Sequence, residues 1–391
     1  MSRFYSHLNT AKSVIKEYKG EMPLSAFLKT FFSNEKKYGS RDRKAIASLC
    51  YSYFRTGCAM QDLSIEEKIL TGLFLSTYNG HELLQNEKPE WNHNIHKPIA
   101  EKLSLASFDV GQIFPFTQEL SEGIEAKGFN TSFLIQPDVF IRVRPGKLEL
   151  IKKKLAQAQI NFEEVIESCL AVENGTKLES ILDINKEAVI QDFNSQRVGE
   201  LLPINDLPKS PKVWDCCAAS GGKSIMTHDL VSTMQLTVSD VRQSIIQNLH
   251  YRFNDAGIKG YNYFVADLTN PKSLQPSLKD SLFDLVICDA PCSGSGTWSR
   301  TPEQLVFFQR KEITRFSNLQ KSIAANAIPY LKKGGFFLYI TCSVFEKENE
   351  EVVEFIQRQA GLTLIRTDLL AGYDRKADSM FAGLFQLKSQ R

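Results

Sequence analysis

The sequence predicts an α/β protein whose C-terminal half is a doubly wound parallel sheet, preceded by a small α+β module and an all-helical N-terminal domain. Three observations lead to this prediction. Apolar residues recur at helical spacing up to about residue 125. From about residue 130 the chain shows short segments, the first of which alternates apolar and basic side chains. From about residue 200 predicted strands and helices alternate to the end of the chain. The expected domains are therefore 1–125, 130–200 and 201–391.

Size and composition point to a soluble protein with more than one domain. The chain has 391 residues, of which 42% are hydrophobic and 10% aromatic. No segment approaches the ~20 apolar residues of a membrane span, and no apolar run of a secretory signal follows the N-terminus. The eight cysteines contain no C-x-x-C pair, so neither a zinc ribbon nor a disulfide framework is expected. We expect a reduced, cytoplasmic protein with no metal and no membrane contact.

The N-terminal domain begins with two expected helices. Apolar residues recur at helical spacing between Leu24 and Phe32 and again between Ile46 and Phe54. The basic run 36–44 lies between them, and Ser40 is expected to cap the second helix. Such a run is either a solvated helix start or a phosphate contact beside a helix N-terminus. The residues alone favour the solvated start.

The α+β module begins with a strand of mixed character. Residues 139–146 alternate apolar and basic side chains and stop at Pro145-Gly146, which predicts a half-buried strand with a basic outer face. A lysine-rich helix follows at 152–154, with shorter strands near 162–165, 170–172 and 188–191. Because the net charge is only +2, any nucleic-acid contact must come from a local patch. As a nucleic-acid contact, this strand is a stronger candidate than anything in the first 125 residues. A solvated edge strand would explain its alternating pattern almost as well.

The C-terminal domain alternates strands and helices. Strands are predicted at 212–216, 235–239, 262–266, 283–288 and 335–341, with helices at 241–256 and 313–331 among the connections. The apolar runs 283–288 and 336–340 suit strands that are covered on both faces. Two late runs, 362–366 and 381–387, are expected at the edges of the sheet.

Four aspartates stand at or just past strand ends: Asp215, Asp240, Asp267 and Asp289. In an open parallel sheet the ligand lies beyond the carboxyl ends of the strands, so these carboxylates are expected to meet on one rim. A carboxylate after the second strand typically accepts hydrogen bonds from ribose hydroxyls. Together with a Gly-Gly turn after the first strand, they predict a cofactor that contains a nucleoside.

The turn after the first strand narrows the choice of cofactor. A phosphate loop would need a glycine at position 217, which is cysteine, and the dinucleotide pattern G-x-G-x-x-G is absent. A small-residue turn lets the backbone approach a ligand without cradling phosphates, which suits S-adenosyl-L-methionine. The residues expected to bind it are Cys217, Ala218, Ala219, Ser220, Gly221, Gly222 and Lys223.

Two cysteines stand in separate short motifs, Asp289-Ala290-Pro291-Cys292 and Thr341-Cys342-Ser343. A thiolate is among the few side chains able to add to C6 of a pyrimidine, which turns C5 into a nucleophile. Chemistry alone does not rank the two thiols as the attacking group. The remaining cysteines read as small hydrophobic residues that pack in the cores: Cys50, Cys58, Cys169, Cys216, Cys217 and Cys288.

These motifs resemble those of the RsmB/Sun-type RNA cytosine-5 methyltransferases. Family members read approximately D-x-C-A-A-P-G-G-K-T, D-A-P-C-S-G-x-G and T-C-S-x-x-x-x-E-N-E. Here the corresponding residues are 215–224, 289–296 and 341–350, and 39–43 with Tyr51 and Arg55 resembles the family's NusB-like helical domain. Two positions depart from the pattern. Ser220 replaces a proline, and 378–381 alters a D-G-F-F pattern, which puts contacts of the last strand in doubt.

The resemblance implies a Rossmann-like class I methyltransferase domain and a role for each motif residue. Cys342 attacks C6 and Cys292 helps to release the product, whereas DNA cytosine methyltransferases attack with their own Pro-Cys. Asp289 holds the base near N3, and Lys223 orients the ring or lowers a thiol pKa. Asp240 binds the ribose of S-adenosyl-L-methionine and Asp267 its adenine, and Asp289 is also among the expected cofactor-binding residues.

The resemblance therefore implies methylation of cytosine C5 in RNA, with ribosomal RNA as the expected substrate and a monomer as the expected state. Two alternatives stay open. One is an enzyme of the same chemistry that acts on tRNA. The other is a non-catalytic RNA-binding factor for ribosome assembly, which the intact Asp289, Cys292 and Cys342 disfavour.

Overall fold

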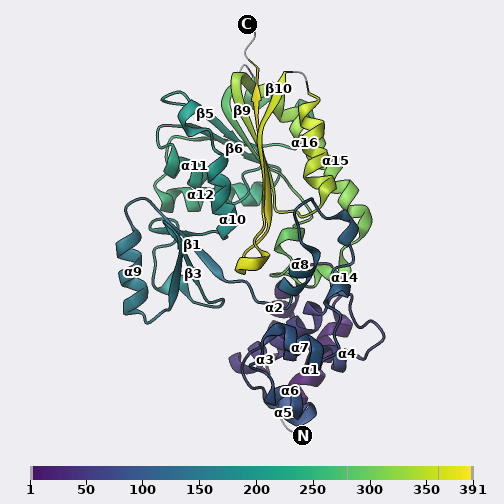
Figure 1. Ribbon diagram of the computed structural model, residues 1–391. Coiled ribbons are helices and arrows are strands. Elements are labelled where there is room, and N and C mark those ends of the chain that lie inside the picture. Colours follow the sequence, from purple (N-terminus) through teal and green to yellow (C-terminus); the bar gives the residue numbers. More distant parts are fainter. Residues whose placement is uncertain (1–2, 280, 360, 389–391) are drawn as a thin grey trace. The chain divides into compact units, whose positions relative to one another are not determined.

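The computed structural model describes residues 3–279, 281–359 and 361–388 (Figure 1). Contacts divide the chain into two units. The first comprises Met1–Leu120, Ile124–Gln136 and Thr297–Arg310, and the second comprises Ser121–Gly123, Pro137–Gly296 and Lys311–Arg391. None of the helices in the described part of the chain has the length and apolar character that crossing a bilayer requires.

The first unit is helical, as predicted. Its helices are α1 (Arg3–Glu17), α2 (Leu24–Asn34), α3 (Ser40–Arg55), α4 (Ile65–Ser76), α5 (Glu82–Glu87), α6 (Pro89–His93), α7 (Ile99–Leu105), α8 (Ala126–Ser132) and α14 (Gln304–Phe307). The expected cap at Ser40 is off by one residue. Ser40 is the first residue of α3, and the carboxylate of Asp42 accepts a hydrogen bond of 3.0 Å from the backbone N–H of Gly39, the residue before the helix. The Asp42 carboxylate therefore fixes the start of α3.

The α+β module within the second unit is an antiparallel sheet in the order β2-β3-β1-β4. Its elements are β1 (Val139–Val143), α9 (Leu148–Gln157), β2 (Phe162–Ile166), β3 (Cys169–Val172) and β4 (Ala188–Ile190), followed by α10 (Phe193–Arg197). Strand β1 pairs with β3 on one side and β4 on the other, so it is not an edge strand. Helix α9 packs on the sheet through Ile151 and Leu155, which are fully buried.

The expected basic outer face of β1 is wrong. Arg142 is only 7% exposed, and its guanidinium lies 2.6 Å from the Asp229 carboxylate. Arg144 contacts the same carboxylate at 2.7 Å and donates to the backbone oxygens of Asn185 and Ala256. These arginines therefore join the module to the rest of the second unit and are not presented to solvent or RNA.

The large sheet has seven strands in the order β10-β11-β9-β8-β5-β6-β7. Its elements are β5 (Lys212–Asp215), α11 (Gly222–Leu230), β6 (Gln235–Asp240), α12 (Gln243–Ala256), β7 (Asn262–Val265), α13 (Pro271–Leu278), β8 (Phe283–Asp289), α15 (Arg310–Ala327), β9 (Leu331–Thr341), α16 (Glu350–Gln357), β10 (Leu362–Leu370) and β11 (Met380–Leu387). Strands β7, β6, β5, β8 and β9 are parallel, whereas β11 and β10 are antiparallel to their neighbours. Of the two expected edge strands only β10 lies at the edge, because β11 is paired on both sides.

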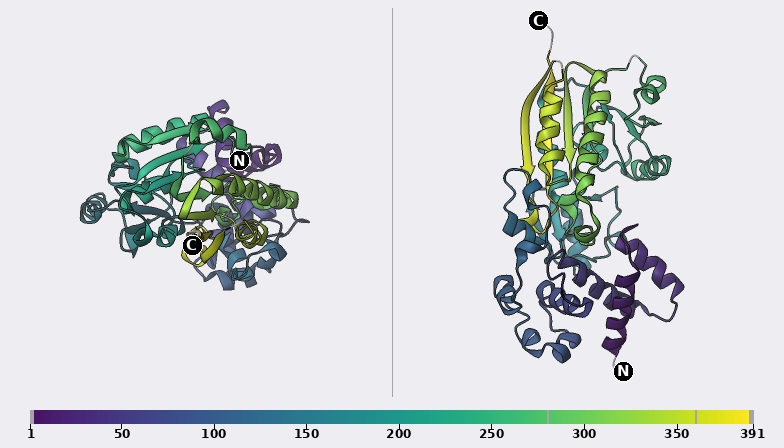
Figure 2. Two further views of the ribbon diagram at one scale, coloured as in Figure 1. Left: turned by 90° about the horizontal axis from the view of Figure 1, so that it is seen from above. Right: turned by 90° about the vertical axis from the view of Figure 1, so that its right-hand side faces the viewer.

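Helices cover both faces of this sheet (Figure 2). Successive residues of a strand point to opposite faces. Val213, Leu285 and Ile287 accordingly pack with residues of α11 and α12. Trp214, Val286 and Phe337 pack on the other face with residues of α13, α15 and α16. Burial on both faces explains why these strands read as continuous apolar runs.

Candidate functional site

A cavity of about 650 Å³ lies at the carboxyl ends of the parallel strands. Residues that follow β5, β6, β7 and β8 line it, and Leu319 and Ile323 of α15 add an apolar wall. Asp240, Asp267 and Asp289 all line this cavity, as expected for carboxylates at the ends of neighbouring parallel strands. The cavity is therefore where the strand-end rule places a ligand.

Asp215 is the exception, and its expected place on the rim is wrong. Its side chain is fully buried, and one carboxylate oxygen accepts a 2.6 Å hydrogen bond from the Ser224 hydroxyl in the first turn of α11. The other oxygen is buried without a hydrogen-bond partner. Burial raises the pKa of Asp215 to about 7, against the smaller opposite effect of Ser224. The residue ties the end of β5 to α11.

The turn between β5 and α11 has the backbone that its small residues permit. Ala219 and Gly221 have φ angles of 44° and 83°. A Cβ atom at Gly221 would lie 2.5 Å from the Phe253 ring, so only glycine fits there. Ser220, in the family's proline position, accepts hydrogen bonds from Arg252 at its carbonyl (2.8 Å) and at its hydroxyl (2.6 Å). Arg252 is thus a support that sequence reasoning missed.

Asp240 holds this turn against β6. One of its carboxylate oxygens accepts from the backbone N–H of Ala219 at 3.1 Å, and the other accepts from the backbone and the side chain of Arg242 at 2.9 and 3.0 Å. Asp267 accepts from the N–H and the hydroxyl of Thr269. Both carboxylates are therefore held in place at the cavity wall and can accept further hydrogen bonds there.

The two motif cysteines meet. The Sγ atoms of Cys292 and Cys342 are 3.3 Å apart, and both side chains are half-buried. Cys292 also lines the cavity. The hydrogen bond to Cys342, together with burial, holds the pKa of the Cys292 thiol well above its usual range. The Cys292 thiol therefore keeps its proton and can donate it in a hydrogen bond to the sulfur of Cys342.

Lys223 lies in the first turn of α11 and joins the cavity to the α+β module. Its ammonium group is 3.1 Å from the Asp289 carboxylate and 2.7 Å from the Ser195 hydroxyl. The Lys223 side chain is only 8% exposed, whereas that of Asp289 is 32% exposed. The lysine is thus fixed behind a carboxylate that faces the cavity. Sequence reasoning assigned no role to Ser195.

A buried carboxylate supports the Cys292 loop. Glu348 accepts hydrogen bonds from the backbone N–H of Ser293 at 2.8 Å and from the Gln320 side chain at 3.0 Å. Burial raises the pKa of Glu348. Its own backbone oxygen accepts from the Tyr339 hydroxyl at 2.6 Å. The motif T-C-S-x-x-x-x-E-N-E pointed to Glu348, but nothing in the sequence pointed to Gln320.

The altered 378–381 segment keeps a close contact with the Cys292 loop. The N–H of Ser379 donates to the Gly296 carbonyl at 2.9 Å, and the N–H of Gly296 donates to the Cys342 carbonyl at 2.9 Å. A Cβ atom at Gly296 would lie 2.0 Å from the Ser379 carbonyl oxygen. The last glycine of the D-A-P-C-S-G-x-G motif is thus needed for the approach of these two loops.

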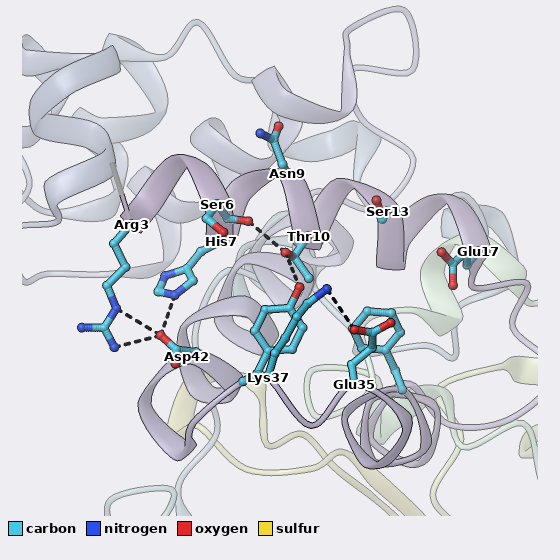
Figure 3. Close-up of a pocket in the computed structure, with 12 residues that line it drawn as sticks. Arg3, Ser6, His7, Asn9, Thr10, Ser13, Glu17, Glu35, Lys37 and Asp42 are labelled. Atoms are coloured by element: carbon cyan, nitrogen blue, oxygen red, sulfur yellow. Dashed lines mark hydrogen bonds and ion pairs between the residues drawn. The ribbon is translucent and has the colours of Figure 1, made fainter. Parts of the chain in front are cut away.

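A second cavity, of about 700 Å³, lies within the helical unit (Figure 3). Most of its charged side chains are paired with one another. Asp42 accepts from Arg3 at 2.8 Å and from His7 at 2.9 Å, and Lys37 contacts Glu35 at 2.9 Å. We assign no chemistry to this cavity.

Comparison with known proteins shows what the C-terminal part of the chain is similar to. Residues 202–381 match the family model described as 16S rRNA methyltransferase RsmB/F. A probable ribosomal RNA small subunit methyltransferase B of Bacillus subtilis is 28% identical over 251 residues, which are 61% of this chain and 55% of that protein. The human 28S rRNA (cytosine(4447)-C(5))-methyltransferase is 28% identical over 306 residues, which are 73% of this chain and 35% of that protein. The matched segments thus span about half or less of these relatives.

The fold also has a solved counterpart. The crystal structure of PH0851 superposes with a TM-score of 0.72, covering 98% of this chain and 99% of that one at 18% identity. At this identity the likeness concerns the fold alone.

Proposed function

Because residues 202–381 match the RsmB/F methyltransferase family model and the chain is similar to a ribosomal RNA small subunit methyltransferase B, we propose that it transfers a methyl group from S-adenosyl-L-methionine to C5 of a cytosine in ribosomal RNA. The observation that carries this proposal is the pair of thiols 3.3 Å apart, one of which lines the cavity at the strand ends. Two thiols beside a nucleoside-sized cavity suit covalent chemistry on a pyrimidine.

The residues of the cavity fit such a cofactor. Asp240, Asp267 and Asp289 give the cavity a negative lining, which favours hydroxyl, amino and ammonium groups and disfavours phosphates. The turn after β5 contributes Cys217 and Ala219 to the lining of the cavity, and its sequence lacks a phosphate-binding pattern. When bound, S-adenosyl-L-methionine supplies an electrophilic methyl group on a sulfonium. We assign the ribose to Asp240, the adenine amino group to Asp267 and the amino-acid end to residues 217–223.

We assign the nucleophile to Cys342. The raised pKa of the Cys292 thiol keeps a proton on Cys292, and this thiol can donate a hydrogen bond to the Cys342 sulfur. A bond from the Cys342 sulfur to C6 makes C5 nucleophilic, and C5 then takes up the methyl group. The C5 proton then passes to water, its electron pair restores the C5–C6 double bond, and the sulfur–C6 bond breaks. Cys342 leaves as a thiolate that accepts a hydrogen bond from the Cys292 thiol.

Asp289 and Lys223 act on the target base. Asp289 faces the cavity and, held by Lys223 at 3.1 Å, is placed to contact the N3 edge of a cytosine. A cytosine protonated at N3 would donate its N3–H to the Asp289 carboxylate, and the proton at N3 draws electrons from C6 and favours attack there. The base must leave its stack to reach these groups, and loops of folded RNA allow that at the lowest cost.

The test is transfer of labelled methyl from S-adenosyl-L-methionine to RNA by the purified chain. Ribosomal RNA, small ribosomal subunits and tRNA are offered separately, and the modified nucleoside is identified by mass spectrometry. We expect 5-methylcytidine in ribosomal RNA, and at least a 100-fold loss of rate in Cys342→Ser. Cys58→Ser, which alters a thiol of the helical unit, is the matched control. Label at another atom, or in tRNA alone, contradicts the proposal, and transfer to none of these RNAs supports a non-catalytic factor.

A further inference from the structure

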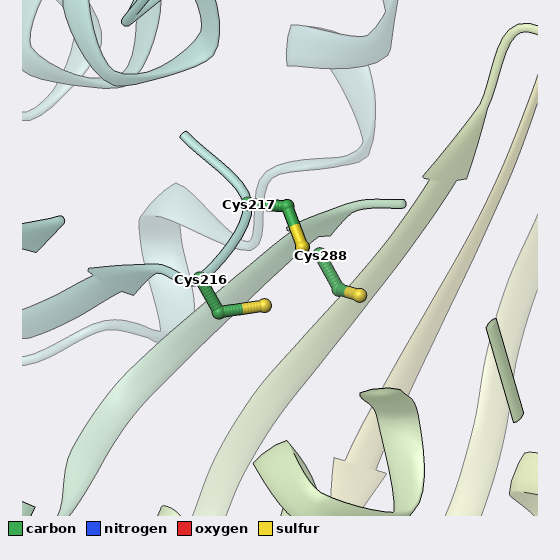
Figure 4. Close-up of side chains that lie close together, drawn as sticks. All are labelled: Cys216, Cys217 and Cys288. Carbon is green, nitrogen blue, oxygen red and sulfur yellow. The ribbon is translucent and has the colours of Figure 1, made fainter. Parts of the chain in front are cut away.

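Three thiols outside the catalytic pair gather beneath the floor of the same cavity. Cys216 and Cys217 follow β5, and Cys288 lies in β8, the strand that pairs with β5. Their Sγ atoms all lie within 4.8 Å of one another, and Figure 4 shows the three side chains close together. Cys216 and Cys288 are fully buried, whereas Cys217 is partly exposed.

We propose that Cys216, Cys217 and Cys288 bind a thiophilic d¹⁰ cation such as Zn²⁺ through three sulfur ligands. Zinc–sulfur bonds are about 2.3 Å long, so three sulfurs on one tetrahedral ion stand roughly 3.8 Å apart. To bind one ion, the sulfur–sulfur distances would have to shorten by at most about 1 Å. Rotation of the cysteine side chains can supply a change of this size. Cys216 and Cys217 also line the cavity, which supplies both a path of entry and a side for a fourth ligand.

The charges around the cluster favour a cation. The carboxylate of Asp289 lines the same cavity as Cys216 and Cys217. A bound cation would replace the thiol protons of the three cysteines.

No other part of the described chain offers an equivalent set. Within residues 3–279, 281–359 and 361–388 this is the only group of three or more histidine, cysteine or acidic side chains with ligand atoms so close together. The expectation of a metal-free chain rested on the missing C-x-x-C pair. A search for C-x-x-C pairs does not detect Cys216 and Cys217, which are adjacent, together with Cys288 on the neighbouring strand.

The test uses the full chain without an affinity tag, in a Cys292→Ser/Cys342→Ser background that removes the other close thiol pair. A phosphine reductant keeps the remaining thiols reduced, and a thiol count checks this before each titration. Cd²⁺ binding is followed by its sulfur charge-transfer absorption, and Zn²⁺ stoichiometry by native mass spectrometry. We expect one ion per chain.

Cys217→Ser is the variant best suited to the test, because its side chain is partly exposed and the fold should tolerate the change. We expect it to weaken Cd²⁺ binding at least tenfold, and Cys288→Ser to do the same with a melting temperature measured in parallel. Cys58→Ser should bind as the background does. The proposal is overturned if reduced protein binds no ion, if binding survives both Cys217→Ser and Cys288→Ser, or if the three thiols form a disulfide that resists the reductant.

Discussion

The sulfur atoms of Cys292 and Cys342 lie 3.3 Å apart although 50 positions separate the two residues in the sequence. The contact follows from the topology of the sheet. Strands β8 and β9 are parallel neighbours, with Asp289 opposite Ile340, so the loops that follow them leave the sheet at the same edge. Each motif is short and local, and only the pairing of these strands brings the two thiols together.

The first prediction concerns the division of labour in this pair. Cys292→Ala should accumulate a covalent protein–RNA adduct, because Cys342 can still attack C6 while release is impaired. Cys342→Ala should give neither adduct nor product. The measurement is denaturing electrophoresis of protein incubated with labelled RNA and S-adenosyl-L-methionine.

The double variant Cys292→Ala/Cys342→Ala is the control, and it should show no adduct. Treatment with nuclease should collapse the adduct of Cys292→Ala to the mobility of the protein. An adduct in Cys342→Ala and none in Cys292→Ala would assign the attack to Cys292 and invert the proposed roles.

The second prediction concerns Lys223. Replacing it with methionine keeps the length of the side chain but leaves Asp289 without its cation and Ser195 without its donor. We expect kcat for methyl transfer to fall by about one to three orders of magnitude, with little change in the KM for S-adenosyl-L-methionine. Steady-state kinetics separates these effects.

Ser195→Ala is the matched variant for Lys223, since it removes one partner of the lysine and leaves the contact with Asp289. A small loss of rate is expected there. An equal loss in both variants would mean that Lys223 acts by joining α11 to the α+β module and not through Asp289.

The strands and the strand-end residues were predictable because their signals are local. Runs buried on both faces are continuously apolar, and in parallel strands the residues after each end meet at one edge. This places Asp240, Asp267 and Asp289 on the cavity without any knowledge of contacts. The same rule failed for Asp215, because a strand-end side chain can also turn inward, here to Ser224.

Contacts between residues far apart in the chain could not be predicted from the sequence. Alternating Arg142 and Arg144 look the same whether they face solvent or a buried carboxylate, and their partner Asp229 lies 87 and 85 positions away. The interior place of β11 was missed for a similar reason. A short apolar run does not show how many of its sides are paired, and β11 lies between β9 and β10.

The third prediction tests the Asp229 network. Asp229→Asn leaves two largely buried guanidinium groups, those of Arg142 and Arg144, without their counter-charge. Removing one partner of a buried ion pair typically costs about 3–5 kcal/mol, so the free energy of unfolding should fall by that order. Denaturant melts of the two proteins measure it. Glu354→Gln breaks the exposed pair with Arg358 and should leave the melt unchanged.

The fourth prediction concerns pH and Asp215. Its pKa in the folded protein is about 7, above the value of about 3.9 for an unfolded chain. The folded state therefore binds the extra proton between these values, so the free energy of unfolding falls as the pH rises from about 4 to about 7. Asp215→Asn cannot titrate and can still contact Ser224, so its melting temperature relative to the unmodified protein should rise from pH 5 to about pH 7 and level off above that pH. Asp267→Asn, at a titratable site open to the cavity, is the control. A difference between Asp215→Asn and the unmodified protein that stays constant over this range would mean that Asp215 is ionised in the folded protein throughout.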